Sequence, residues 1–127
     1  MRVQSSYDYV IVRVVPRVER DEFVNAGVIL HAPTRAYLGC AIALPAARLL
    51  ALAPEIDVAA VARHLDAVRA VCAGDPDAGP IARLTPSERF HWLSTPRSAV
   101  IQPSPTHAGL CDDPAATLAS LFAQAVA

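Results

Sequence analysis

The first third of the chain alternates apolar and polar positions in the way that β-strands do. Between Tyr7 and Val15 the three even-numbered valines share one face, and β-branched and aromatic residues of this kind favour strands. Pro16 ends the segment, and Phe23 to Leu30 predicts a second strand that forms a long hairpin with the first. After the turn at Pro33, Tyr37 to Leu44 predicts a third strand, so we expect a three-stranded antiparallel meander.

The middle of the chain predicts three helices. A proline at the first turn favours a short helix over Ala46 to Leu52. Asp57 is an N-cap residue and Gly74 a helix stop, and the apolar residues between them recur at three- and four-residue steps. The stretch Thr85-Pro86-Ser87-Glu88 is a capping box, which predicts a third helix that runs through Trp92.

The last quarter of the chain predicts one strand and one helix. Ser98 to Gln102 lies between two prolines and is a candidate fourth strand. Asp113 caps a final helix with one apolar stripe, Leu118, Leu121, Phe122 and Val126. Because strands come first and helices follow, the pattern favours an α+β fold: an antiparallel sheet of three to four strands, the N-terminal meander plus one later strand, with helices packed on one face.

Composition limits the class of protein further. With 127 residues, 54% of them hydrophobic and 18% charged, the chain suits a single domain, residues 1–127, with its own core. No stretch offers the roughly 18 uninterrupted apolar residues that a membrane span needs, so no membrane partner is expected. A formal net charge of -1 makes nucleic acid an unlikely partner, because nucleic-acid binders carry a clearly basic domain or stripe.

Cysteine usage and the start of the chain indicate the compartment. Asp8 and Arg13 interrupt the first hydrophobic run, so no export signal is expected. Cys40, Cys72 and Cys111 are odd in number and have no C-x-x-C spacing, which argues against a disulfide framework and a zinc ribbon. The first two occupy patterned positions and are expected to be small core residues. A cytoplasmic location fits this usage.

Two pairs of stretches resemble a known family. The first pair runs from Tyr7-Asp8-Tyr9-Val10 through Glu22-Phe23-Val24-Asn25-Ala26-Gly27-Val28, and the second from Ser87-Glu88-Arg89-Phe90-His91-Trp92-Leu93 through His107-Ala108-Gly109-Leu110-Cys111. Together they are similar to the bacterial domain-of-unknown-function family 3037, from the first strand to the last helix. Members of that family are often encoded near proteins that resemble HipA-type kinases, so the resemblance implies a HipA-like kinase-type protein as partner. It implies no catalytic residues.

One candidate binding surface lies on the predicted second strand. Period-two alternation puts Asn25, Gly27 and His31 on one face, and Arg13 contributes from the neighbouring strand. In the functional interpretation, Gly27 lets a ligand approach the sheet and Asn25 binds it. In the structural interpretation, Gly27 marks a bulge and Asn25 hydrogen-bonds the backbone of the hairpin.

A second candidate site lies in the loop-rich segment Glu88 to Asp113. It carries four basic side chains, Arg89, His91, Arg97 and His107. These side chains predict an anion pocket, because guanidinium groups bind phosphate and carboxylate bidentately. The structural alternative is that Arg89 pairs with a local carboxylate and Trp92 anchors the loop. His107 and Cys111 are spaced for zinc or for a nucleophile and base, yet no third partner is identifiable, so neither a metal nor a cofactor is predicted.

Phosphate-binding glycine loops, zinc-protease motifs, nucleophile elbows and dinucleotide fingerprints are absent from the sequence. The leading hypothesis is therefore a non-catalytic protein-binding or regulatory domain. The alternative is a small enzyme or anion-binding domain that acts on a phosphorylated or carboxylated ligand, which convergence of the four basic residues would favour. A third hypothesis is that the domain binds single-stranded nucleic acid on an aromatic sheet face that carries Tyr7, Tyr9 and Tyr37. An exposed edge strand would also permit a homodimer.

Overall fold

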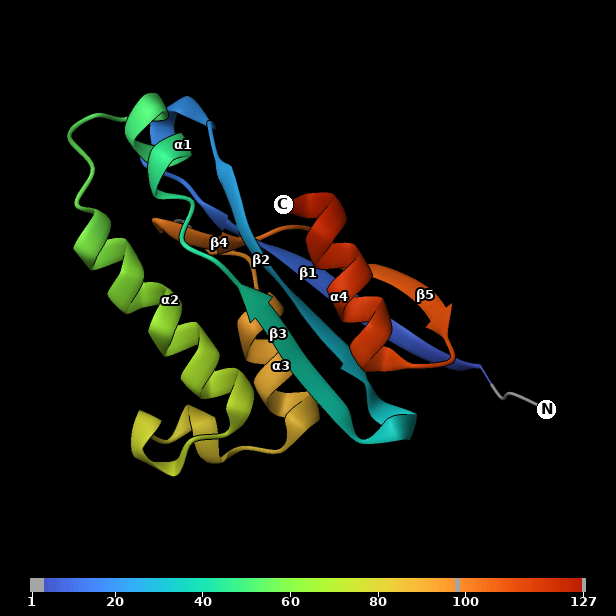
Figure 1. The fold of residues 1–127 in the computed structure, drawn as a ribbon. Helices are drawn as coiled ribbons and strands as arrows, with labels where there is room; N and C mark the ends of the chain where they lie inside the picture. The colour runs from blue at the N-terminus through green and yellow to red at the C-terminus, as the bar shows by residue number, and fades with distance from the viewer. Residues whose placement is uncertain (1–3, 98, 127) are drawn as a thin grey trace.

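One antiparallel sheet and four α-helices make up the computed structural model, which describes residues 4–97 and 99–126 (Figure 1). Along the chain the elements are β1 (Ser5–Val14), β2 (Val24–Ala32), β3 (Tyr37–Ile42), α1 (Ala46–Leu52), α2 (Val58–Ala73), α3 (Pro86–Ser94), β4 (Ile101–Pro103), β5 (His107–Cys111) and α4 (Pro114–Ala125). The expected α+β class is confirmed. No helix in the described ranges is long and apolar enough to cross a bilayer.

The strands are ordered β3-β2-β1-β4, and β5 also pairs with β1. β4 pairs with the C-terminal end of β1 and β5 with its N-terminal half, so the two short strands follow one another along the same edge. The predicted N-terminal meander is confirmed. β5 was not predicted, so the sheet has five strands where three to four were expected. β4 begins later than the predicted Ser98–Gln102 segment, of which Ser98 lies outside the described residues.

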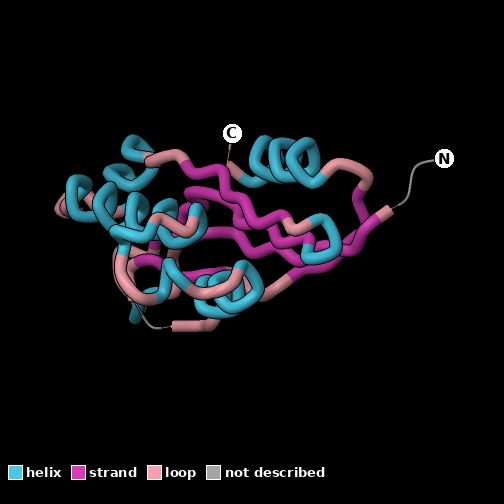
Figure 2. The backbone as a smooth tube through the Cα atoms, turned by 90° about the horizontal axis from the view of Figure 1, so that it is seen from below, coloured by secondary structure: helices cyan, strands magenta, loops and turns pink. Residues whose placement is uncertain are grey.

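Helices cover both faces of the sheet, which corrects the expectation that they pack on one. α1, α2 and α3 cover the face that carries the even-numbered valines of β1 and Ile29 of β2. α4 covers the opposite face (Figure 2). There Leu118 packs in one cluster with Val28, Leu30 and Ala32. The reason lies in β2, whose near-continuous apolar run has to be buried on both faces.

A β-bulge in β2 decides which side chains face which layer. In the β1–β2 register Val12 pairs with Gly27 and Arg13 with Asn25, so Ala26 is the extra residue. Ala26 faces the α2 layer, whereas the Asn25 side chain reaches α4. If the side chains of β2 are assigned to alternating faces from its first residue, every assignment after the bulge is therefore on the wrong face.

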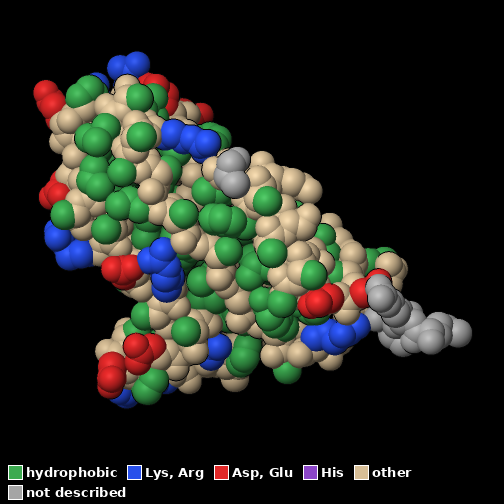
Figure 3. All heavy atoms as spheres, in the orientation of Figure 1, with side chains coloured by type: hydrophobic (Ala, Val, Ile, Leu, Met, Phe, Trp, Pro, Cys, Tyr) green, Lys and Arg blue, Asp and Glu red, His purple; other side chains and the backbone are tan. Residues whose placement is uncertain are grey.

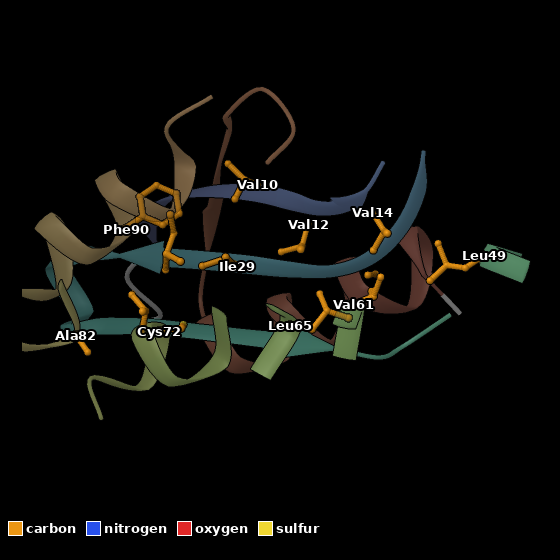
Figure 4. Close-up of a cluster of buried hydrophobic side chains, with 13 residues drawn as sticks. Val10, Val12, Val14, Ile29, Leu49, Val61, Leu65, Cys72, Ala82 and Phe90 are labelled. Atoms are coloured by element: carbon orange, nitrogen blue, oxygen red, sulfur yellow. The ribbon is translucent and has the colours of Figure 1, made fainter. Parts of the chain in front are cut away.

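The larger core cluster lies between the sheet and helices α1 to α3 (Figure 4). Val10, Val12 and Val14 of β1 are almost completely buried there, together with Leu65 of α2 and Phe90 of α3. Burial of an aliphatic or aromatic side chain of this size contributes about 1.5–3 kcal/mol. This cluster fixes α2 and α3 on the sheet.

The helix boundaries follow the predicted caps. Asp57 accepts a hydrogen bond from the backbone of α2, and Gly74 ends that helix in a left-handed conformation. Thr85 and Glu88 form the predicted capping box of α3, and Asp113 caps α4. These ends are local features, which explains why the sequence predicts them closely.

A buried serine fills the gap between β4 and β5. The Ser104 hydroxyl accepts a hydrogen bond of 2.8 Å from the backbone N–H of Ile11, and the Ser104 N–H donates to the Ile11 carbonyl at 2.8 Å. Its neighbours Pro103 and Pro105 have no N–H to offer. Ser104 therefore supplies the hydrogen-bond partners of the Ile11 N–H and carbonyl, at the point of β1 that neither β4 nor β5 reaches.

Candidate functional site

Trp92, the sole tryptophan of the chain, stands on the outer side of α3. Phe90 and Leu93 of the same helix are buried, whereas 38% of Trp92 is exposed. α3 is held by its capping box and by its buried face, so the indole projects from a fixed helix.

A groove with a volume of about 500 Å³ lies on one side of the indole. It runs between α2 and the segment that follows α3, and its walls are His64, Ala67, Val68, Val71, Trp92, Arg97, Ala99, Val100 and Ile101. Most of these side chains are apolar. Two basic side chains line it, and the described lining includes no acidic one.

A second groove, of about 450 Å³, lies on the other side of the indole. Its lining residues are Leu84, Ser87, Glu88, His91, Trp92, Thr95 and Arg97. The two grooves share Trp92 and Arg97. We call these two grooves together the Trp92 surface.

Arg97 is held against the indole of Trp92. Its Cζ lies 4.5 Å from the indole ring centroid, a cation–π contact. Nη2 donates to the carbonyl oxygen of Trp92, and Nε donates to that of Thr95 at 3.3 Å. Within the described part of the chain, no hydrogen bond involves Nη1. Arg97 thus has a fixed position and a donor group left for another molecule.

Arg89 lies away from both grooves. Its Nη1 donates to the carbonyl of Leu84 at 2.7 Å, and its guanidinium lies against Gly74 at the C-terminus of α2. A positive charge at that end of a helix is favourable. The local geometry gives Arg89 a role in joining α3 to α2.

His107 lies on the α4 side of the sheet, with its ring stacked on that of Tyr9 and the centroids 5.1 Å apart. The four basic residues predicted to form an anion pocket are therefore divided: His91 and Arg97 line one groove, and Arg89 and His107 lie elsewhere. Across residues 4–97 and 99–126, no group of three or more His, Cys, Asp or Glu side chains is placed to hold a metal ion.

The candidate binding surface on the sheet, Arg13, Asn25 and His31, does not lie on one face either. Arg13 and Asn25 are partners across β1 and β2. Asn25 Nδ2 donates to the carbonyl of Ala125 at 3.2 Å, and Arg13 lies over the ring of Phe23 with its Cζ 4.1 Å from the centroid. Both polar side chains are half-buried and contact their own chain.

His31 faces the opposite layer, so the expectation that it shares a face with Asn25 is wrong. The bulge at Ala26 separates the two residues along β2. The His31 ring is buried, with its centroid 5.2 Å from that of Phe90. Burial lowers the pKa of His31, and its cross-strand neighbour Asp8 acts in the opposite direction.

The three tyrosines considered for nucleic-acid binding do share one face, and α4 packs on that face. Tyr7, Tyr9 and Tyr37 belong to the same apolar cluster as Leu118. On the face of the molecule that Figure 3 shows, acidic and basic side chains are interspersed and form no extended basic patch. Neither feature provides the open aromatic platform with a basic track that single strands bind.

The contribution of α2 to the Trp92 surface was not predicted. His64 is an exposed residue of α2, and it lines the larger groove with Val68 and Val71. The available signal was a second stripe on α2, at three- and four-residue steps beside the buried one.

A family model matches nearly the whole chain. The model of a family described as "Protein of unknown function (DUF3037)" matches residues 9–126, which include every wall of the Trp92 surface. No curated protein and no solved structure matches the chain.

Proposed function

Since the chain belongs to the DUF3037 family, whose function is unknown, we propose from its surface that it is a non-catalytic protein-binding or regulatory domain that docks a partner on the Trp92 surface. The observation that carries this proposal is an exposed indole on a fixed helix between two grooves that share Arg97. Tryptophan and arginine are enriched among the residues that dominate binding energy at protein interfaces.

Apolar side chains extend the surface on both sides of the indole. Val100 beside the larger groove is 39% exposed, and Leu84 beside the smaller one is 36% exposed. Exposed apolar residues that lie together around an aromatic anchor are typical of an interaction site. The tryptophan also loses little conformational entropy on binding, because its ring is already held by Arg97.

The lining of the larger groove defines the chemistry of the partner. The apolar wall from Val68 and Val71 takes an apolar side chain, and the Nη1 group of Arg97 takes a carboxylate. We therefore propose a protein segment in which an apolar residue lies close to an Asp or Glu. The family resemblance makes a HipA-like kinase-type protein the first candidate, and three cysteines in the free form fit a bacterial cytoplasm.

A small enzyme or anion-binding domain is the less supported alternative. Arg89 and Arg97 donate to carbonyl oxygens of their own chain. His107 stacks on Tyr9, on the α4 side of the sheet. Such dispersed and internally bonded side chains provide no cluster for catalysis.

The test uses the single tryptophan as a probe. The domain is labelled with 5-fluorotryptophan, which gives one ¹⁹F resonance, and is titrated with the purified HipA-like kinase from the same organism. We expect the resonance to shift on binding. In calorimetry, Trp92→Ala and Arg97→Gln are expected to weaken the affinity by about tenfold or more. Leu110→Ala, a change at a 64% exposed residue of β5, is the matched control and is expected to bind like the wild type.

Other outcomes are equally decisive. If the kinase does not bind, proteins captured from the lysate are identified and tested with the same three variants. The docking surface is wrong if no partner loses affinity on Trp92→Ala. A ¹⁹F shift on addition of inorganic phosphate or acetate alone would favour the anion-binding alternative.

A further inference from the structure

Two of the three cysteines meet where α2 passes beside β3. Cys40 of β3 is half-buried, and Cys72 in the last turns of α2 is 2% exposed. Cys40 packs against the core cluster to which Cys72 belongs, at the contact between α2 and β3, and each of the two thiols is the largest influence on the pKa of the other. Figure 4 shows Cys72 in this layer, between the sheet and α2.

The surroundings of the two thiols differ. Arg69 on α2 donates from Nη2 to the carbonyl of Ile42 at 2.9 Å, which places its charge over the end of β3. The hydrogen bond with Cys72 and the charge of Arg69 lower the pKa of the Cys40 thiol, and burial opposes them. The hydrogen bond with Cys40 and burial raise the pKa of Cys72. Cys40 is thus the more accessible thiol and the one that ionises first.

We propose that Cys40 and Cys72 are a peroxide-sensitive dithiol that forms a disulfide between β3 and α2. The Cys40 thiolate attacks one oxygen of hydrogen peroxide, the O–O bond breaks, and the products are a Cys40 sulfenic acid and hydroxide. The Cys72 sulfur then attacks the Cys40 sulfur. The S–S bond forms, and the sulfenic oxygen leaves as water. In total the two thiols lose two electrons and two protons, and one peroxide becomes two waters.

Cys111 provides an internal control for this chemistry. It lies at the end of β5, is 4% exposed, and pairs across strands with Ser5. It belongs to neither α2 nor β3, and the core cluster that brings Cys40 and Cys72 into one layer does not include it. A reaction that depends only on cysteine content would include Cys111, whereas one that depends on proximity of two thiols leaves it out.

The experiment treats the folded wild-type chain with hydrogen peroxide and analyses it without reduction. We expect a mass loss of about 2 Da, a fall from three free thiols to one, and a linked peptide that contains Cys40 and Cys72. Cys111→Ser is expected to keep the mass loss, and Cys40→Ser to abolish it. The bridge is also expected to raise the melting temperature by several degrees, reversibly with dithiothreitol.

Three results would overturn the proposal. They are a bridge that includes Cys111, the addition of about 32 Da as a sulfinic acid with no bridge, and survival of all three thiols at peroxide concentrations that oxidise the urea-unfolded chain. Circular dichroism of Cys40→Ser and Cys40→Ala checks that the variants fold. Peptide mapping of the wild type decides the outcome even if they do not.

Discussion

The guanidinium of Arg89 lies against Gly74, where a Cβ atom would come within 3.2 Å of the arginine Cζ. Gly74 ends α2 with a φ of 72°, and Arg89 also donates to the carbonyl of Leu84, just before α3. One side chain of α3 therefore holds both the end of α2 and its own N-terminal turn. The sequence presents this arginine as a ligand-binding residue, and the contacts make it a structural one.

Replacement of Arg89 is expected to destabilise the fold. Arg89→Ala should lower the free energy of unfolding by about 1–2 kcal/mol, because a hydrogen bond from a charged group and a favourable charge at a helix C-terminus are lost. Urea denaturation measures the change. Arg83→Ala is the matched control, since this exposed arginine makes a single 3.2 Å bond to Pro76, and its effect should stay within about 0.5 kcal/mol. If the two variants lower the free energy of unfolding equally, the claim that Arg89 joins α3 to α2 is wrong.

Gly27 should tolerate no side chain. A Cβ atom there would lie 2.6 Å from the carbonyl oxygen of Ala41, so β2 and β3 would have to separate. We expect Gly27→Ala to lower the free energy of unfolding by about 2 kcal/mol or more, as overpacking does. Gly39→Ala is the comparison: its Cβ would meet the Tyr37 ring, a side chain that can move. A larger loss for Gly39→Ala in chemical denaturation would contradict this account.

The sequence predicts the elements whose signals are local. The capping residues Asp57 and Gly74 give the bounds of α2, and Thr85 gives the start of α3, because each acts within one helical turn. The bulge at Ala26 is different. Alternation is counted in steps of two, so one extra residue reverses every later assignment, and only the pairing with β1 reveals it.

The candidate site also combines residues that local signals identify with contacts that only the fold determines. His91 and Arg97 were identified from their residue types and lie with Trp92 on one surface. A second stripe on α2 marks His64 and Val68, but the wall that they contribute also depends on how α2 packs beside α3, a contact between separate elements that the stripe does not specify. The separation of His107 from the other basic residues depends on β5 pairing with β1, another contact between distant parts of the chain.

His31 predicts a pH dependence of stability. Burial lowers the pKa of the folded-state imidazole below its ordinary value of 6.5, so the unfolded chain binds the proton more readily. The contribution of His31 is therefore complete above about pH 6.5 and is lost as the pH falls toward the lower folded-state pKa. Urea denaturation at pH 7.5 and pH 5.5 should show a larger loss for the wild type than for His31→Leu. An equal loss would mean that His31 is not the group responsible.

Ser104 makes the most specific prediction about the sheet. Ser104→Ala leaves the Ile11 N–H without its acceptor between β4 and β5, and an unsatisfied buried donor costs about 1–3 kcal/mol. Urea denaturation should show that loss. Amide hydrogen exchange at Ile11 should accelerate more than at Val10, because the change is local. Ser120→Ala on the exposed side of α4 is the control and should change stability by no more than about 0.5 kcal/mol. Exchange that rises equally at Ile11 and Val10 would mean that Ser104 stabilises the whole fold without acting as the acceptor for Ile11.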